Sequence, residues 1–427
     1  MSSWIWWIGG IILGLLLIVL LLLYCFGFFR RKVEYRAENF PAPSMPNFTF
    51  TVATLSNAVS SQGSLTGFWV EAPEIFAVRL DAIRNAKNYI QFETFFMTPG
   101  PRAEEFAEAI ATKARSGVRI QLIVDSYGVK SLPQSYWKRL RGAGVEVVFF
   151  NPFSFRNAIE YLNRNHRKLL IVDDRVAYIG GAGVSDFWDG KSGSGEKGPW
   201  LDFEIRFEGP LVMAFKGVFQ QHWLQLGETV DFEETPLLPS TSEGRTTLIS
   251  VGENPNYRNS PIRTLFKNAI LAARSRFWIA SPYFLPNTDA ARLLVDAKQR
   301  GVDVRILTMG HISDKKFIYY TSRELYRSLL EGGVEIYEYQ PSMMHAKTLL
   351  IDGEWVSLGS SNLDPRSFFR NDELNISMTD GLLSKQMEQF FEYAFSKSLL
   401  VTKHQWRRRS LRQRTIGKLG LIFYWQL

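Results

Sequence analysis

The sequence predicts an α/β fold in which one structural unit occurs twice, preceded by a single transmembrane helix. Three observations predict it: an apolar run opens the chain, helical patterns alternate with apolar strands, and this alternation occurs in two blocks of similar length. Strands that alternate with helices indicate sheets covered by helices. The chain has 427 residues, 46% of them hydrophobic, which is enough for about two to three domains.

The apolar run at residues 4–29 contains neither a charged residue nor a proline. It is longer than the roughly 20 residues that cross a bilayer core as a helix. A cleaved signal peptide needs a basic start, a shorter apolar region and a small-residue cleavage site, and the chain instead starts Met-Ser-Ser. We therefore expect a retained, single-pass anchor. Arg30, Arg31 and Lys32 follow it directly, and the positive-inside rule then places the remaining chain in the cytoplasm.

The two blocks are expected at residues 65–232 and 246–400, with linkers at 30–64 and 233–245 that are rich in proline, serine or glycine. In the first block, predicted helices at 76–87, 109–116 and 136–141 precede strands at 89–96, 118–124 and 145–150. In the second block, helices at 262–274, 291–300 and 324–330 precede strands at 277–284, 302–308 and 334–339. Glycines such as Gly117 and Gly301 follow the helices and supply the left-handed residue that ends them.

The basic residues are unevenly distributed. Lys and Arg number 50 against 42 Asp and Glu, a net charge of +8, and the segment 399–427 alone holds seven basic residues and no acidic one. A nuclease would carry its positive charge over the catalytic face, so this distribution predicts an anionic surface as partner and no nucleic acid. The tail 401–427 also contains apolar and aromatic residues and is expected to lie on a membrane surface, with a solvated basic tail as the alternative.

One motif occurs in both blocks. His166, Lys168 and Asp173 have the spacing His-x-Lys-x4-Asp, and His345, Lys347 and Asp352 repeat it. A glycine follows each aspartate at the same distance, at Gly180 and at Gly359. With average residue frequencies, the chance of this double match is on the order of 1 in 10,000. The motif therefore indicates a shared chemical role.

The spacing suits chemistry on a phosphodiester. Residues two apart in a strand face the same side, so each histidine lies beside its lysine, and both pairs are expected to meet where the blocks join. Lysines neutralise phosphate oxygens, one histidine attacks phosphorus, and the other protonates the leaving alkoxide. Ser360 and Asn362 lie in a turn that offers further donors. A lysine beside each histidine disfavours a divalent cation, so neither a metal nor another cofactor is predicted.

The chain resembles the phospholipase D superfamily from about residue 67 onward, and its flanking residues are similar to the bacterial cardiolipin synthase branch. Beyond the two motifs, the resemblance rests on Glu-Thr-Phe-Phe at 93–96, Trp200-x-Asp202, Ser-Pro-Tyr-Phe at 281–284, Asn-Leu-Asp-Pro-Arg-Ser at 362–367, and Asn371-x-Glu373. It implies a duplicated phospholipase D-type α/β sandwich with the active site at the interface of the two domains. It also implies a covalent phosphohistidine intermediate that forms without a metal.

The resemblance assigns the site residues. His166 would be the nucleophile and His345 the general acid. The remaining roles would be phosphate binding by Lys168 and Lys347 with the help of Ser360 and Asn362, and orientation of the histidines by Asp202 and Glu373. Asp173 and Asp352 are expected to lie past the site in structural roles. Gly183 departs from the family pattern, which commonly has Asn there, and leaves open whether Ser185 replaces that ligand. His222 has no companion motif and is expected to be an ordinary residue.

These expectations combine into a membrane-anchored phosphatidyltransferase of the bacterial cell membrane. It would join two phosphatidylglycerol molecules, or other anionic phospholipids, into cardiolipin with release of glycerol. One alternative is a phospholipase D that uses water and releases phosphatidic acid. A nuclease and a non-catalytic membrane scaffold are the others. The sequence predicts no particular oligomeric state.

Overall fold

The computed structural model describes residues 3–25, 35–157, 160–192, 195–196, 198–232, 245–253, 255–256 and 259–427. The basic residues expected to orient the anchor, 30–32, lie outside the described residues, as does almost all of the expected linker 233–245.

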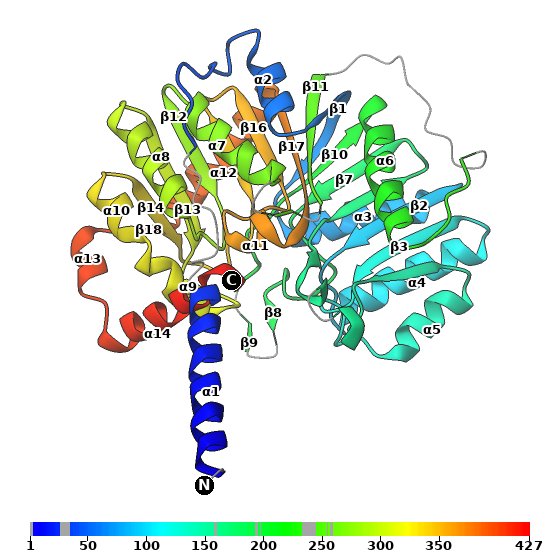
Figure 1. The fold of residues 1–427 in the computed structure, drawn as a ribbon. Coiled ribbons are helices and arrows are strands. Elements are labelled where there is room, and N and C mark those ends of the chain that lie inside the picture. The colour runs from blue at the N-terminus through cyan, green and yellow to red at the C-terminus, as the bar shows by residue number, and fades with distance from the viewer. Residues whose placement is uncertain are drawn as a thin grey trace.

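Helix α1 (Ser3–Cys25) stands apart from the folded body and projects from one side of it (Figure 1). Its stretch Trp6–Tyr24 has a mean hydropathy of 2.8 and no buried residue, so it is long and apolar enough to cross a membrane. Among the described helices it is the one candidate span. A hydrogen bond from Arg370 Nη2 to Tyr24 Oη (3.3 Å) links its last turn to the body.

The first half of the body contains seven main strands and four helices. In chain order they are β1 (Val59–Trp69), α3 (Ala72–Asn85), β2 (Tyr89–Thr94), α4 (Pro101–Arg115), β3 (Arg119–Asp125), α5 (Gln134–Gly142), β4 (Glu146–Phe150), β6 (Leu169–Val172), β7 (Val176–Gly180), β10 (Glu204–Glu208) and α6 (Pro210–Gln225). Short pieces lie between them: β5 (Arg164–Asn165), the 3₁₀ turns Phe155–Asn157 and Glu160–Leu162, and the hairpin β8 (Lys191–Ser192) and β9 (Gly195–Glu196).

The second half repeats this order. Its elements are β11 (Arg245–Gly252), α7 (Pro261–Ala272), β12 (Arg276–Ala280), α8 (Thr288–Gln299), β13 (Asp303–Met309), α9 (Lys316–Glu324), α10 (Tyr326–Glu331), β14 (Glu335–Tyr339), β15 (Thr348–Ile351), β16 (Trp355–Gly359), α11 (Pro365–Phe369), β17 (Asn371–Thr379), α12 (Gly381–Ser396) and β18 (Ser398–Leu400). The duplicated α/β fold predicted from the alternation is confirmed.

Both halves contribute to one continuous sheet of 16 strands. Its order is β18-β14-β13-β12-β15-β16-β17-β11-β1-β10-β7-β6-β2-β3-β4, with β5 paired to β17. Strands β2, β3 and β4 are parallel, as are β12, β13 and β14. The first strands of the two halves, β1 and β11, pair antiparallel in the middle, so the repeat units meet edge to edge.

Helices cover both faces of the sheet because strand residues alternate between them. In the first half, Phe92 of β2 packs with α3, α4 and α5, whereas Leu169 and Ile171 of β6 pack with α6. The core under α6 continues under α12 of the second half. The two halves therefore share this part of the hydrophobic core and form a single packed unit.

The segment expected as a linker, 30–64, is ordered over its described part. Helix α2 (Phe48–Leu55) lies there, and β1 begins at Val59. Phe48 and Val52 are fully buried in the core of the second half. The proline and serine content suggested a linker, but these two apolar side chains fix the segment on the fold, so the expectation was wrong there.

The tail is also folded. Helices α13 (Lys403–Arg407) and α14 (Leu411–Ile422) follow β18, and the 3₁₀ turn Tyr424–Gln426 ends the chain. Gly417 and Gly420 allow α14 to approach α9 closely, because a Cβ at either would overlap Tyr320 or Thr321. Leu411 and Leu419 of α14 and Phe423, directly after it, are exposed on the same segment as its basic residues.

Candidate active site

The two motif segments meet where the halves join. His166 and Lys168 precede β6, and His345 and Lys347 precede β15. The sequence suggested that each pair lies inside a strand, and the structure shows that neither does. Each segment instead bonds to the other half. The His166 N–H donates to Asp372 O (2.9 Å), and the His345 N–H donates to Leu201 O (2.8 Å). These cross-links, together with the pairing of β5 with β17, hold both motifs at the interface.

Each histidine is paired with a carboxylate from the opposite half. His166 Nδ1 lies 3.0 Å from Glu373 Oε2, and His345 Nδ1 lies 2.8 Å from Asp202 Oδ2. Asp202 and Glu373 occupy equivalent positions, two residues before Glu204 and Asn375, which pair with the equivalent glycines Gly180 and Gly359. A proton on Nδ1 held by a carboxylate leaves Nε2 with its lone pair free. The structure thus brings together all four predicted residues in two crossed pairs.

The lysines lie beside the histidines within the same buried space. Lys168 Nζ donates to the main-chain oxygen of His166 (2.5 Å), and Lys347 Nζ lies 2.9 Å from His345 Nδ1. Both lysines are at most 3% exposed. Two ammonium groups in so small a buried space create a strong attraction for an anion.

The electrostatics of the site follow from burial and from these cations. Burial, with the charges of Lys168 and Lys347, holds the pKa of His166 well below its ordinary value. Burial and Lys347 lower the pKa of His345 to about 4, although Asp202 opposes this. Burial lowers the pKa of Lys168 to about 7 and that of Lys347 to about 8. Both imidazoles are therefore neutral near pH 7.

The two carboxylates differ. Burial raises the pKa of Glu373 to about 7, and Lys168 opposes this only in part. Burial alone would also raise the pKa of Asp202, but its hydrogen bond with His345 and the nearby Lys347 bring it below its usual value. Asp202 is therefore the stronger anionic partner, so a positive charge on its histidine is stabilised more than one on the histidine beside Glu373.

Two serines after the second motif donate hydrogen bonds to the carboxylate of Glu373. The Ser360 hydroxyl donates to Glu373 Oε2 and accepts from the Leu374 N–H (2.9 Å). The Ser367 hydroxyl donates to Glu373 Oε1 (2.7 Å). Asn362 is buried, and its Oδ1 has no hydrogen-bond partner among the described residues. Of the two predicted phosphate ligands, Ser360 is already engaged and Asn362 has an unused polar atom.

The first half has no side chain at the corresponding position, Gly183, for a steric reason. A Cβ on Gly183 would lie 2.3 Å from Phe96 O, and one on Gly181 would lie 2.2 Å from Asp202 Oδ1. Ser185, the possible substitute, bonds with Thr98 (2.5 Å) instead. This glycine turn is fixed from behind by Arg79, whose guanidinium donates to Ala182 O (3.0 Å) and Gly183 O (3.2 Å) and also pairs with the buried Glu204.

The motif aspartates Asp173 and Asp352 lie past the strands, away from the histidines. Each has a positive φ of 54° and accepts a fan of main-chain N–H groups from the loop before a parallel strand. Asp173 Oδ1 accepts from Asn88 N (2.7 Å), and Asp352 Oδ1 from Ser275 N (2.8 Å). They tie the motif strand to the neighbouring loop and do not contact the reacting groups.

Four aromatic residues of the site were missed by the sequence reasoning. Trp188 Nε1 donates to Asp202 Oδ2 (3.0 Å), and the rings of Trp188 and Trp200 lie 5.3 and 5.4 Å from the His345 ring. Phe95 lies edge-on to His166 at 5.3 Å, and Phe187 packs on Trp200 at 6.0 Å. Trp200 and Phe95 stand in motifs that were recognised, but nothing in their spacing indicates contact with a histidine.

His222 is not the ordinary residue expected. It is 1% exposed, its Nδ1 bonds Glu93, and its Nε2 lies 3.5 Å from Asp372 Oδ2. Burial opposes protonation of His222, but Glu93 and Asp372 raise its pKa above the ordinary value. Asp372 also accepts the His166 N–H through its main chain. No sequence signal links His222 to strands so distant in the chain.

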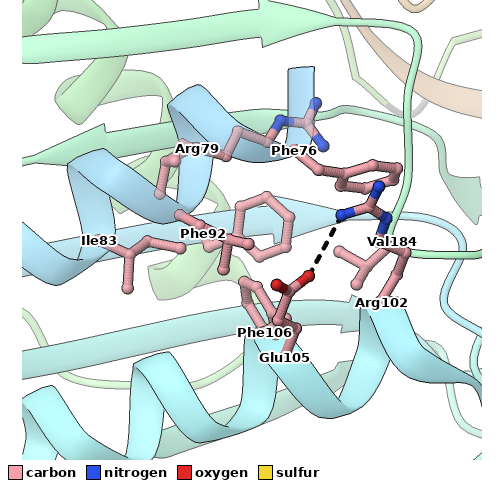
Figure 2. Close-up of a pocket in the computed structure, with 10 residues that line it drawn as sticks. Phe76, Arg79, Ile83, Phe92, Arg102, Glu105, Phe106 and Val184 are labelled. Atoms are coloured by element: carbon pink, nitrogen blue, oxygen red, sulfur yellow. Dashed lines mark hydrogen bonds and ion pairs between the residues drawn. The ribbon is translucent and has the colours of Figure 1, made fainter. Parts of the chain in front are cut away.

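In the described parts of the chain, two cavities lie outside this site, and the larger, of about 380 Å³, is an open polar pocket lined by Pro101, Arg102, Glu105, Asp186, Asp189 and Lys191. The cavity in Figure 2 lies between α3 and α4 and is lined mainly by apolar residues, with Arg79 and Arg102 at its edge. Its volume is about 10 Å³, close to the smallest space that holds one water molecule. The described residues contain no group of three or more His, Cys, Asp or Glu side chains placed to hold a metal ion.

Comparison with known proteins agrees with this geometry. The family model described as "Cardiolipin synthase, PLD-like domain" matches residues 80–186 and 266–395. A cardiolipin synthase of Geobacillus kaustophilus is 32% identical over 361 residues, covering 83% of this chain and 70% of that protein. One of Alkalihalophilus pseudofirmus is 35% identical over 321 residues, covering 74% of this chain and 63% of that protein.

A solved structure shares the fold. The phosphatidylserine synthase of Haemophilus influenzae superimposes with a TM-score of 0.64 at 15% identity, covering 87% of this chain and 96% of that one. The chain is thus an enzyme of the phospholipase D superfamily. Within it, the chain belongs to the cardiolipin synthase family.

Proposed function

We propose that this protein transfers a phosphatidyl group from one phosphatidylglycerol to another, forming cardiolipin and releasing glycerol. The observation that carries the proposal is the crossed pairing of two buried histidines with carboxylates of the opposite halves, beside two buried lysines. That arrangement suits displacement at phosphorus in two steps. The names of its relatives supply the product, cardiolipin.

In the first step, His166 Nε2 attacks phosphorus and forms a P–N bond. The P–O bond to the glycerol headgroup breaks, and the departing oxygen takes a proton from His345. In the second step, a headgroup hydroxyl of another phosphatidylglycerol gives its proton to His345 and attacks phosphorus. The P–N bond then breaks and restores His166. Lys168 and Lys347 stabilise the negative oxygens throughout.

The electrostatics support this division of roles. His166 is neutral and has its lone pair available, because burial and the lysines hold its pKa low. His345 must be protonated to act as an acid, and its partner Asp202 is the carboxylate with the lowered pKa. A bound phosphodiester would offset the charges of Lys168 and Lys347 and so raise the pKa of His345. The acid would therefore be charged only when substrate is present.

Water as acceptor is the rival reaction. It uses the same residues and ends in phosphatidic acid, and the aromatic residues around His345 favour exclusion of water. The test is mass spectrometry of the products formed by the purified full-length protein in phosphatidylglycerol vesicles, with His345→Ala as the blank. Cardiolipin with an equal amount of glycerol supports transfer. Phosphatidic acid without cardiolipin would make water the acceptor.

We also propose that α1 crosses the bacterial cell membrane and that the catalytic body lies on the cytoplasmic side. The apolar surface of α1 supports the first part, and the three basic residues that follow it support the second. The exposed apolar and basic side chains of α14 would lie against the same membrane. Protease treatment of sealed inverted vesicles, which expose the cytoplasmic side, should digest the body, and right-side-out vesicles should protect it.

A further inference from the structure

The loop between β4 and β5 exposes a group of large apolar side chains. We define the aromatic loop as the described residues 151–157 and 160–163. In it, Phe155 is 91% exposed, Phe153 57% and Leu162 43%. Apolar residues scattered singly on a surface are ordinary, but a contiguous exposed group on one loop marks an interaction site.

The aromatic loop has a defined internal structure. The Phe153 ring lies 5.1 Å from the Phe155 ring and 5.3 Å from the Tyr161 ring, in both cases edge to face. The base is closed by Asn151, whose Nδ2 donates to Glu160 O (3.0 Å) and Asn163 O (3.2 Å). These contacts hold the rings together, and the phenylalanine rings remain exposed on the surface of the loop.

Hydrogen bonds place the aromatic loop on the side of the molecule from which α1 emerges. Arg366 Nη2 donates to Leu162 O of the loop (3.0 Å), and Arg366 Nη1 donates to Gln426 O near the C-terminus (3.1 Å). Four residues along, Arg370 donates to the Tyr24 hydroxyl at the end of α1. Helix α11 therefore connects the aromatic loop, the C-terminal segment and the anchor. Figure 1 shows α1, α14 and the C-terminus together on this side.

We infer that the aromatic loop inserts its phenylalanines into the surface of the same anionic phospholipid bilayer that α1 crosses. Aromatic rings are favoured at the membrane interface. Arg156, which is exposed and directly follows Phe155, would meet lipid phosphates, and Glu160 is the one acidic residue among the loop's described residues. The loop lies on the first half, whereas α14 lies on the second, so the two would hold the body against the membrane from both halves.

The position of the aromatic loop in the chain links the proposed membrane contact to the candidate active site. The aromatic loop runs into the segment Arg164–Lys168, which carries the histidine proposed as nucleophile. Asn163 ends the loop only three residues before His166. A loop seated in the headgroup region would bring this segment to the depth of the lipid phosphates. This inference rests on the proposed function for the identity of the substrate, but the contact itself can be measured without turnover.

The test measures the depth of a spin label in vesicles of phosphatidylglycerol. Cys25 is the only cysteine, so Cys25→Ser gives a full-length background without cysteine. Phe155→Cys carries the label in the aromatic loop. Phe50→Cys is the matched control, because Phe50 is also highly exposed (75%) and lies on α2, at the end of the molecule opposite α1 (Figure 1).

We expect the label at position 155 to be accessible to dissolved oxygen and shielded from a water-soluble nickel chelate, and the label at position 50 to show the reverse. Equal access of the chelate to both labels would overturn the inference. So would a label at position 155 that is shielded from both reagents and dipolar-coupled to a second copy, because the loop would then be a protein interface.

A second measurement separates this contact from catalysis. Phe153→Ser with Phe155→Ser should lower turnover of phosphatidylglycerol in vesicles about tenfold, because two interfacial rings are lost. Turnover of dispersed short-chain phosphatidylglycerol should stay at the wild-type rate. Equal losses on both substrates would instead indicate damage to the site. A wild-type protein inactive on both would refute the proposed function and leave the depth measurement valid.

Discussion

Exchanging the two carboxylates for amides should separate the roles of the two histidines. Asp202→Asn removes the charge 2.8 Å from His345 Nδ1. At this distance, with an effective dielectric constant of about 20, opposite unit charges attract by about 6 kcal/mol. The amide can still accept a hydrogen bond, and charge-assisted bonds are about twice as strong as neutral ones. We therefore expect a loss of about 3 kcal/mol in the transition state, or roughly 100-fold in kcat with phosphatidylglycerol.

The assay compares two donors in the first turnover. Glycerol needs a proton to leave, whereas p-nitrophenolate does not, so phosphatidyl-p-nitrophenol should bypass the acid. With this donor, the first-turnover burst of Asp202→Asn should remain close to the wild-type rate. Glu373→Gln, the matched variant, removes the charge that stabilises the positive imidazole formed when His166 attacks phosphorus, and it should slow the burst with both donors. If Asp202→Asn loses as much with the activated donor as with phosphatidylglycerol, His345 is not the proton donor and the reasoning fails.

Three further predictions concern stability and pH. Arg79→Met leaves the buried carboxylate of Glu204 unpaired behind the glycine turn and should lower the free energy of unfolding by about 3–5 kcal/mol. As the control, Arg115→Ala at an exposed ion pair should change this free energy by less than about 1 kcal/mol. Denaturant titration measures both. Because the pKa of Lys168 is lowered to about 7, kcat/KM should fall as pH rises through neutrality. Lys168→Arg, whose cation does not titrate, should move this descending limb of the pH profile to higher pH. A descending limb that stays at the same pH would exclude Lys168 as its source. His222→Phe removes the buried imidazole that bonds Glu93 and lies beside Asp372, and it should lower the thermal midpoint by several degrees. His404→Phe at an exposed site should leave the thermal midpoint unchanged.

The sequence alone determined the fold class and the duplication, and it predicted the histidines and lysines that the structure brings together where the halves join. Helix and strand periodicity is local, so most ends of the expected elements lie within four residues of the observed ones. The exceptions are α4, which begins at Pro101 where the sequence predicted 109, and the break between α9 and α10. The motif at His166 and its repeat at His345 could be found from their identical spacing. The candidate membrane span could be predicted because an uncharged apolar run of that length is typical of a transmembrane helix.

The tertiary structure alone decided how these parts combine. Glu373 serves the histidine of the first half and Asp202 that of the second, because β5 pairs with β17 and the motif segments bond across the junction. That pairing joins residues about 200 positions apart, for which single-sequence periodicity carries no information. The hydroxyl of Ser360 donates to Glu373, 13 residues further along the chain, although its motif suggested phosphate.

Packing explains the remaining differences. Gly183 cannot carry the side chain common in the family, because Phe96 O occupies the space. His222 lies in a buried ion cluster, which no pattern along the chain indicates, since its partners Glu93 and Asp372 come from opposite halves. Part of the expected linker forms α2, and two of its apolar side chains pack in the core of the second half. Local sequence determines which elements form, whereas the space left between distant elements determines which side chains meet.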